Sequence, residues 1–438
     1  MPGVPGDLQL TIVVPTRNRA DLAAAAAESV LEDVPAGVSV LVSDNSTAPY
    51  DLERLERHCR ERAHPQLRYV RPPEPLSMAA HWEWAVRQSL DGGATHVAFL
   101  TDRMVYRPGE VARLLALVRM HPDRVISFNL DEIDDFSAPV ALLQQDWTGH
   151  LYEVDSARVL SLAARGTLPG GPIPRMLNCV APREVLEAVA LRFGSLFDSI
   201  APDFCFAFRC LTIIPSVAYY DKSALIHYAT ARSNGGSYRR GLANDAQADF
   251  EANLSEQGLN HATPAPDIPT VGNAIFHEYC LVAARAPEAP PLELQGYLGY
   301  IARELPALRD PDLRESIQKR LCELGWNPGM ARRERLRFVG GVLPYAVQPY
   351  NFLRRALWQG RRSSAFDALW RSTAVVGVHP PVWLRFPDAQ AALAYARGHP
   401  RRRARQPSDV RGLGWPFAHK LPAPAAARQA GPARAGVS

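Results

Sequence analysis

The sequence predicts an α/β fold built on a mainly parallel sheet with helices on both faces. Two observations support this prediction. Short apolar runs of strand length alternate with longer segments of helical periodicity over residues 8–129, and the connections between them are short. Parallel strands joined by helical crossovers require such a sheet, because each crossover helix packs on one of its faces.

The composition is typical of a globular chain with a large core. The 438 residues are 47% hydrophobic and 21% charged, and two domains are expected at this length. The formal net charge of +4 is small, so we expect no nucleic-acid partner. The six cysteines lack metal-ligand spacing and no signal segment is evident, which favours reduced thiols in a cytoplasmic protein. No apolar run approaches the roughly 18 residues of a membrane span.

The N-terminal half supplies the expected sheet. Five apolar, β-rich runs predict strands over residues 8–14, 38–42, 67–70, 96–100 and 124–129. The segments between them predict helices over about residues 19–31, 50–62, 78–90 and 111–118. Asn18 and Asp21 are suited to cap the first of these helices.

The alternation loosens after residue 130. Residues 131–135 form an acidic run and residues 166–174 are rich in glycine and proline, and both are expected as loops over the sheet edge. Further on, we expect helices over residues 185–191 and 204–211, the second started by Pro202, and a strand over residues 213–220. Helical periodicity then recurs over residues 274–285, 292–305 and 313–324.

These patterns divide the chain into three expected regions. We place an α/β domain at residues 1–260, a small helical C-terminal domain or appendage at residues 261–395, and a disordered basic tail rich in Pro, Ala and Arg at residues 396–438. The basic aromatic stretch 332–371 has two interpretations. Arg, Trp and Phe suit peripheral contact with anionic lipid, which would place this cytoplasmic protein at the inner face of the membrane. Ordinary helices that expose arginine and bury tryptophan are the alternative.

Polar residues follow the expected strands at the edge where ligands collect in α/β sheets. Asp44 follows the second strand, and Asp102 and Arg103 follow the fourth. The cluster around Asp44 is either a binding site or a simple turn. Asp203 precedes an amphipathic helix, where it is either a proton acceptor or a carboxylate that complements the helix dipole.

Three segments in order carry a resemblance to a known family. They are TIVVPTRNR at residues 11–19, VSDNS at residues 42–46, and the stretch from Phe99-Leu100 to Pro108-Gly109. Together they resemble the successive signatures of family 2 glycosyltransferases with the GT-A fold, over about residues 8–240. The resemblance implies a GT-A-type domain and an inverting enzyme. Such an enzyme moves a sugar from a nucleoside diphosphate sugar to a hydroxyl acceptor, saccharide or lipid-linked, in glycan, glycolipid or natural-product assembly. The alternative is a degenerate, non-catalytic scaffold that binds nucleotide-sugars.

The resemblance also implies roles for individual residues. Pro15, Thr16 and Arg17 match the first-strand contact with the donor, and Asp44 matches the aspartate that binds the nucleotide. Asp203 resembles the catalytic base on the acceptor side, which would deprotonate the attacking hydroxyl.

The metal-binding Asp-x-Asp motif of the family falls on Thr101-Asp102-Arg103, where only one carboxylate is present. Two explanations remain open. Asp102 binds a divalent cation, Mn²⁺ or Mg²⁺, with phosphate oxygens, water and His227 as further ligands. Alternatively, donor binding is independent of metal and Arg103 or Arg107 neutralises the phosphates directly. A lone histidine such as His227 is also compatible with a structural role.

Overall fold

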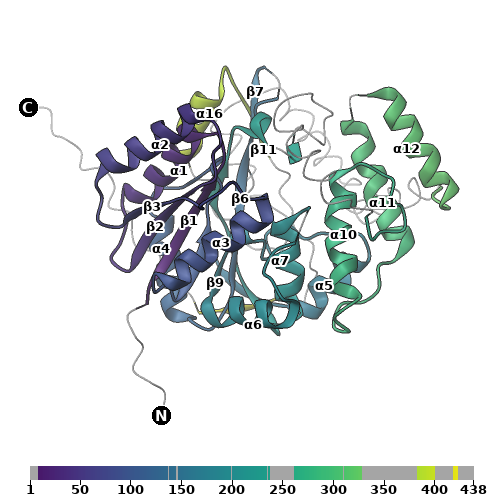
Figure 1. Ribbon diagram of the computed structural model, residues 1–438. Helices are drawn as coiled ribbons and strands as arrows, with labels where there is room; N and C mark the ends of the chain where they lie inside the picture. Colours follow the sequence, from purple (N-terminus) through teal and green to yellow (C-terminus); the bar gives the residue numbers. More distant parts are fainter. Residues whose placement is uncertain are drawn as a thin grey trace, which may run out of the picture.

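One mixed sheet runs through the protein, and helices cover both of its faces (Figure 1). The structure is a computed structural model. It describes residues 8–136, 138–144, 147–198, 200–233, 235–236, 261–308, 310–327, 382–399 and 418–422. Within them the sheet has 12 strands, and its principal order is β12-β8-β10-β6-β9-β4-β1-β2-β3. The predicted α/β class with a mainly parallel, doubly covered sheet is confirmed.

The N-terminal strands form a parallel unit whose chain order reverses at β1. This unit consists of β1 (Leu10–Thr16), β2 (Val38–Asp44), β3 (Leu67–Val70) and β4 (His96–Phe99). β1 pairs in parallel with β2 on one side and with β4 on the other, and β3 continues beyond β2. Because the connections diverge at this point, the carboxyl ends of β1 and β4 are where a ligand is expected to bind.

The rest of the sheet continues in the same direction across one reversed strand. The elements involved are β9 (Cys179–Pro182), β6 (Ile126–Asp134), β10 (Ser216–His227), β8 (Leu151–Asp155) and β7 (Val140–Gln144). β9 is antiparallel to both β4 and β6, and β10 is parallel to β6. β6 and β10 therefore run in the same direction as β1 and β4. β7 and β8 are antiparallel additions to β6 and β10.

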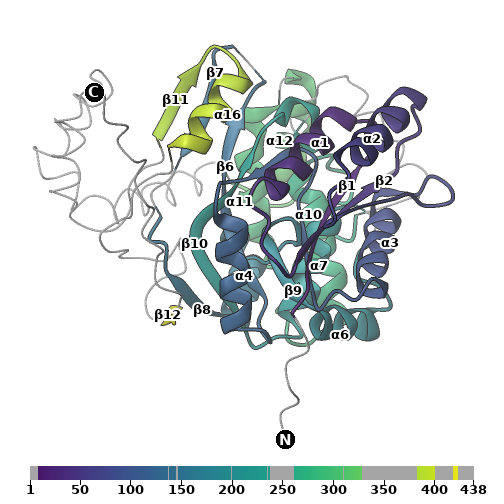
Figure 2. The same cartoon turned by 90° about the vertical axis from the view of Figure 1, so that its left-hand side faces the viewer.

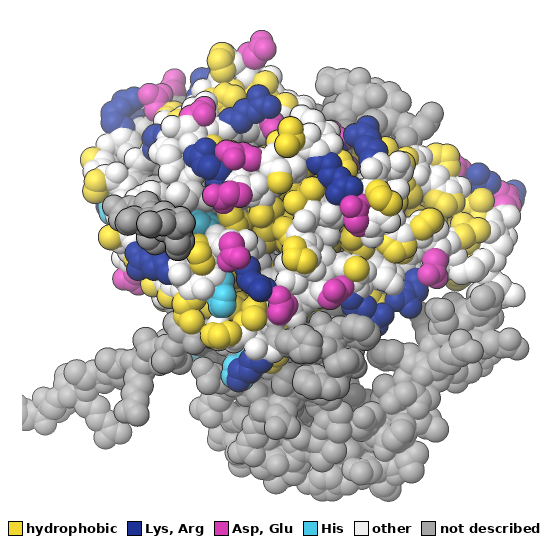
Figure 3. Space-filling model, turned by 90° about the horizontal axis from the view of Figure 1, so that it is seen from below, with side chains coloured by type: hydrophobic (Ala, Val, Ile, Leu, Met, Phe, Trp, Pro, Cys, Tyr) yellow, Lys and Arg dark blue, Asp and Glu magenta, His cyan; other side chains and the backbone are white. Residues whose placement is uncertain are grey.

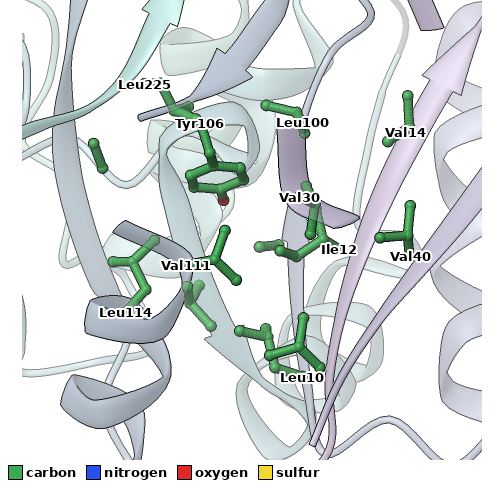
Figure 4. Packing of buried hydrophobic residues seen from close by; sticks show 14 of the residues in the cluster. Leu10, Ile12, Val14, Val30, Val40, Leu100, Tyr106, Val111, Leu114 and Leu225 are labelled. Atoms are coloured by element: carbon green, nitrogen blue, oxygen red, sulfur yellow. The ribbon is translucent and has the colours of Figure 1, made fainter. Parts of the chain in front are cut away.

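Alternating side chains of β1 pack into different cores, which explains the apolar run of this strand. Leu10, Ile12 and Val14 contact the helices of one face (Figure 4), whereas Val13 packs on the other. The first face is covered by α1 (Ala20–Leu31), α2 (Pro49–Arg62) and α4 (Glu110–Met120). The second is covered by α3 (Met78–Asp91), α6 (Arg183–Phe193) and α7 (Pro202–Leu211). Burial on both sides is typical of strands in parallel sheets.

The expectation of an acidic loop at residues 131–135 is wrong. Residues 131–134 belong to β6, in which residues 132–134 pair with β7 and residues 131 and 132 pair with β10. Asp131 is buried and forms an ion pair with Arg107, which lies between β5 (Met104–Tyr106) and α4. A distant partner thus neutralises a charge that, in sequence, favours a loop.

The capping predicted for α1 is also wrong. Asn18 has a left-handed φ of 55°, and its Oδ1 accepts the N–H groups of Thr47 and Ala48 at the start of α2, at 2.8 and 3.0 Å. In return, Asp51 Oδ1 of α2 accepts the N–H of Ala20, the first residue of α1, at 3.0 Å. The two helix starts therefore exchange caps, which a search for local capping residues does not detect.

The helical C-terminal region is confirmed, and it packs directly on the α/β part. It contains α10 (Val271–Ala283), α11 (Leu294–Glu304) and α12 (Pro311–Glu323). Their apolar faces share one cluster of buried residues with α5 (Ser156–Ala164) and α7. The expected boundary at residues 260 and 261 adjoins a segment outside the described residues, so the domain division stays a prediction.

Two strands near the C-terminus join the sheet, although composition predicts helix and then disorder there. β11 (Val382–Phe386) pairs with β7, and β12 (Ala418–Leu421) pairs with β8. Between them, α16 (Ala389–Gly398) packs beside β7 (Figure 2). Sheet edges offer backbone partners regardless of composition, which explains the difference. Most of the expected tail lies outside the described residues.

Two surface expectations concern membranes and nucleic acid. The basic aromatic stretch 332–371 lies outside the described residues, and no helix among those described has the length and apolarity to cross a bilayer. Figure 3 shows one face of the protein, on which the described basic and acidic side chains are interspersed. A mixed surface of this kind is consistent with the small net charge.

A close backbone contact joins the helical region to the α/β part and generates a stability prediction. Gly166, after α5, has φ of 68°, and a Cβ there would lie 2.0 Å from the carbonyl oxygen of Gly296 in α11. We expect Gly166→Ala to lower the free energy of unfolding by about 3 kcal/mol, from backbone strain plus this overlap. Gly194→Ala is the control, since its φ of 86° is similar but the surrounding space is open. There we expect about 1 kcal/mol. Equal losses in urea denaturation would contradict the prediction.

Candidate functional site

Three of the residues singled out in the sequence meet at the carboxyl ends of the parallel strands. Thr16 and Asp44 are partners in the register of β1 and β2. Thr16 Oγ1 donates a hydrogen bond of 2.9 Å to Oδ2 of Asp102, which follows β4. All three side chains are buried. The hydrogen bond thus crosses the point where the chain order reverses, and it fixes the carboxylate of Asp102 at the expected ligand edge.

Asp44 is held by two donors. Tyr69 Oη of β3 donates to its Oδ2 and the N–H of Ser46 donates to its Oδ1, both at 2.9 Å. Burial and the adjacent Asp44 raise the pKa of Tyr69, so the phenol stays protonated as a donor. The hydrogen bond from Ser46 closes the simple turn that was the alternative to a binding site at Asp44. Each oxygen can still accept a further hydrogen bond, so the turn and a binding role are compatible.

Asp102 lies between two arginines. Arg19 Nη1 is 3.5 Å from its Oδ2, and Arg103 Nη1 is 3.4 Å from its Oδ1. Burial lowers the pKa of Arg103 to about 10; Asp102 opposes this shift, and the nearby Arg19 and Arg232 add to it. With this pKa the guanidinium group of Arg103 remains charged at neutral pH. Convergent arginines of this kind are suited to bind phosphate oxygens.

The short strand β5 brings Arg103 and His227 together. β5 is antiparallel to the end of β10, with Met104 opposite His227, and the N–H of Tyr228 donates to the carbonyl oxygen of Arg103 at 2.9 Å. Burial raises the pKa of Tyr228 to about 12, and Asp102 acts in the same direction. Tyr228 therefore lies near Asp102 as a neutral hydroxyl.

The two predicted metal ligands, Asp102 and His227, both have arginines in their surroundings. Both carboxylate oxygens of Asp102 face arginines, and no group of three or more His, Cys, Asp or Glu side chains in the described part of the chain could hold a metal ion. The Nε2 of His227 is buried and makes no hydrogen bond to a described residue. Burial lowers the pKa of His227 to about 3, with Arg103 and Arg175 acting in the same direction. The divalent cation at Asp102 and His227 therefore stays a prediction.

Pro15 and Arg17 flank Thr16 at the same edge. Pro15 is buried opposite Ser43 in the strand register, and Ser43 Oγ lies 2.8 Å from His81 Nε2 of α3. Burial lowers the pKa of His81 to about 4, and Arg17 acts in the same direction. Arg17 is therefore near the β2 end as well. The predicted donor-binding residues thus lie along one continuous edge of the sheet.

Asp203 lies in the first turn of α7, as the sequence predicts. Its side chain is 18% exposed, and its Oδ2 is 4.0 Å from Nη1 of Arg175. Burial raises the pKa of Asp203, while Arg175 and the N–H groups at the helix start oppose the shift. A carboxylate with a raised pKa is a suitable proton acceptor for a hydroxyl group.

Arg175 connects Asp203 to the strand-end cluster. Its guanidinium lies 5.3 Å from the ring centre of Phe204, and it interacts electrostatically with both Asp203 and His227. His227 in turn interacts with Arg103. Arg175 and His227 are thus close enough to influence each other between the expected acceptor side and the expected donor side.

Several residues of the site are not found from the sequence. Arg19 ends the segment 11–19 that carries the resemblance but was given no role, and Tyr69 lies in an expected strand without a distinguishing signal. Arg107, one of the expected sources of positive charge, is paired with Asp131 instead. Arg175 follows the glycine- and proline-rich passage, whose expected position over the sheet edge was its only signal. Tyr228 could have been suspected only from its place next to His227.

Comparisons with known proteins give a distant structural likeness. No protein-family model and no curated protein matches the chain. The crystal structure of residues 1–349 of S. aureus TarS in complex with UDP-GlcNAc has a TM-score of 0.41 and 14% identity, covering 71% of this chain and 91% of that one. The same residues in complex with UDP give 0.40 and 12%, with coverage of 72% and 89%. For the longer TarS structure the TM-score is 0.39 and the identity 13%. That match covers 73% of this chain but only 53% of the TarS chain.

The arginines around Asp102 generate a binding prediction. We expect Arg19→Met and Arg103→Met each to weaken binding of inorganic pyrophosphate in EDTA by about tenfold, since each removes a charge-assisted hydrogen bond. Arg60→Met is the control, because Arg60 pairs with Glu56 on the exposed face of α2. Isothermal titration calorimetry measures the affinities. Equal affinity in all variants would show that the anion binds elsewhere.

Proposed function

We propose that this chain is an inverting glycosyltransferase of the GT-A type. It would move a sugar from a nucleoside diphosphate sugar to a hydroxyl of a saccharide or lipid-linked acceptor. One observation carries the proposal: the Thr16–Asp102 pair, with Arg19 and Arg103 around it, lies at the chain reversal of a parallel sheet, beside Asp44. Strand ends at such a reversal are the usual place for nucleotide ligands in α/β folds.

The donor side follows from the groups along this edge. Asp44, oriented by Tyr69, would accept hydrogen bonds from the base or the ribose hydroxyls. Arg19 and Arg103 would face the diphosphate, where negative charge increases as the sugar leaves. Asp102 would act mainly by holding these two guanidinium groups in place.

We further propose that donor binding does not depend on a metal held by protein side chains. The geometry around Asp102 and His227 supports this, because arginines occupy the surroundings of both groups. Arg103 supplies the positive charge in this proposal, whereas Arg107 is committed to Asp131 in the interior.

Asp203 would carry out the proton transfer. Its carboxylate accepts the proton of the acceptor hydroxyl while the hydroxyl oxygen forms a bond to the anomeric carbon of the donor. The bond from that carbon to the diphosphate oxygen breaks on the opposite face, so the configuration inverts and the nucleoside diphosphate leaves with the electron pair. Arg175 would keep Asp203 ionised despite its burial.

The first test of the proposal combines donor binding with turnover. Calorimetry with UDP-, GDP- and dTDP-sugars, in EDTA and with added manganese, should identify a donor that binds in EDTA. With this donor and p-nitrophenyl glycosides as acceptors, we expect Asp203→Asn to reduce release of the nucleoside diphosphate by at least about 100-fold without loss of donor affinity. Glu187→Gln, on the exposed side of α6, is the control. If a donor binds but is neither hydrolysed nor transferred to any acceptor, the non-catalytic scaffold is favoured instead.

A second test uses the pH dependence of turnover. A general base works when ionised, so activity falls as the pH drops through the pKa of Asp203. Arg175 lowers this pKa against the effect of burial. Arg175→Met should therefore raise the pKa and move the acid limb of kcat to higher pH, whereas Arg175→Lys should leave it near its original position. An unchanged acid limb in the Met variant would argue against the contact.

A further inference from the structure

A buried glutamate of the C-terminal helical region reaches the start of α7. Glu278 of α10 is 1% exposed. Its Oε1 accepts the backbone N–H groups of Ile200 and Ala201 at 3.2 and 3.0 Å. α10 lies beside α7 in the structure (Figure 1). The two residues that it holds come directly before Pro202 and Asp203.

The start of α7 depends on this external acceptor. Ala201, at the N-cap position, makes no side-chain capping bond, and Pro202 has no N–H. Buried backbone donors need a partner, and here it is a side chain 78 and 77 positions further along the chain than Ile200 and Ala201. The direction in which the chain passes into α7 is therefore fixed from outside the α/β part.

The other anchors of this turn come from within the α/β part. Arg209 of α7, which is buried, donates to the carbonyl oxygen of Ser195 at 2.8 Å and pairs with Asp198. The N–H of Leu196 donates to Glu83 of α3 at 2.8 Å. These contacts hold the chain before the turn. The contacts of Glu278 hold the residues next to Asp203.

We propose that Glu278 is a positioning residue for Asp203, and that the C-terminal helices thereby complete the acceptor side of the site. This inference rests on the proposed function of Asp203 as the base. A displacement of the reacting groups by about 1 Å can lower a rate by about 100-fold. Glu278 need not be charged for this role. Burial raises its pKa to about 7, and both of its forms can accept the two hydrogen bonds.

The test compares three substitutions at one position. Glu278→Met removes the acceptor, Glu278→Asp withdraws it by one methylene group, and Glu278→Gln keeps it without charge. With the donor found by calorimetry, we expect kcat to fall by about 10- to 100-fold in the Met and Asp variants. We expect the donor Kd to stay within about twofold, because the donor edge is untouched. The Gln variant should turn over within about threefold of the unaltered protein.

The outcomes distinguish this inference from the proposed function. Asp203→Asn is measured alongside, and full turnover in that variant would refute the base assignment itself. If Asp203→Asn is inactive but Glu278→Met and Glu278→Asp keep their kcat, the positioning role is wrong. It is also wrong if donor affinity falls in proportion to kcat, or if Gln is as impaired as Met. Where the Met variant does not fold, the Asp variant decides by the same criteria.

Discussion

The hydrogen bond between Thr16 and Asp102 is the contact on which the rest of the site depends. It joins the ends of two strands that are neighbours in the sheet but 86 positions apart in the chain. It also sets the orientation of a carboxylate that two arginines approach from different sides. Without it, the partly buried guanidinium groups of Arg19 and Arg103 would lie together with no fixed counter-charge, which is costly away from solvent.

In the proposed function, the arginines around Asp102 supply the positive charge for which a metal ion is the alternative. A metal ion bound by carboxylates can dissociate, whereas a guanidinium group is a permanent charge of the protein. Permanent charge has to be stabilised when no ligand is bound. Asp102 meets this need for Arg103, and Asp21 does so for Arg232, which forms an ion pair with it at 2.8 Å.

Features with a local cause could be predicted from the sequence. The strands β1 to β4, the helices α1 to α4, the position of Asp44 and Asp102 at strand ends, and the start of α7 at Pro202 all follow from periodicity, turn residues and proline geometry. Features that depend on distant partners could not. The acidic end of β6 requires Arg107, and Arg175 and Glu278 gain their importance only from the fold, which brings both to the first turn of α7.

The exchanged caps of α1 and α2 have a consequence for the motion of the sheet edge that carries Thr16. Asn18 and Asp51 each satisfy the backbone of the other helix, so neither helix start can open alone without leaving N–H groups of both unpaired. The two crossovers should thus open and close as one cooperative unit rather than fray separately. The segment that carries Thr16 and Arg17 would then keep the same conformation with and without a bound ligand.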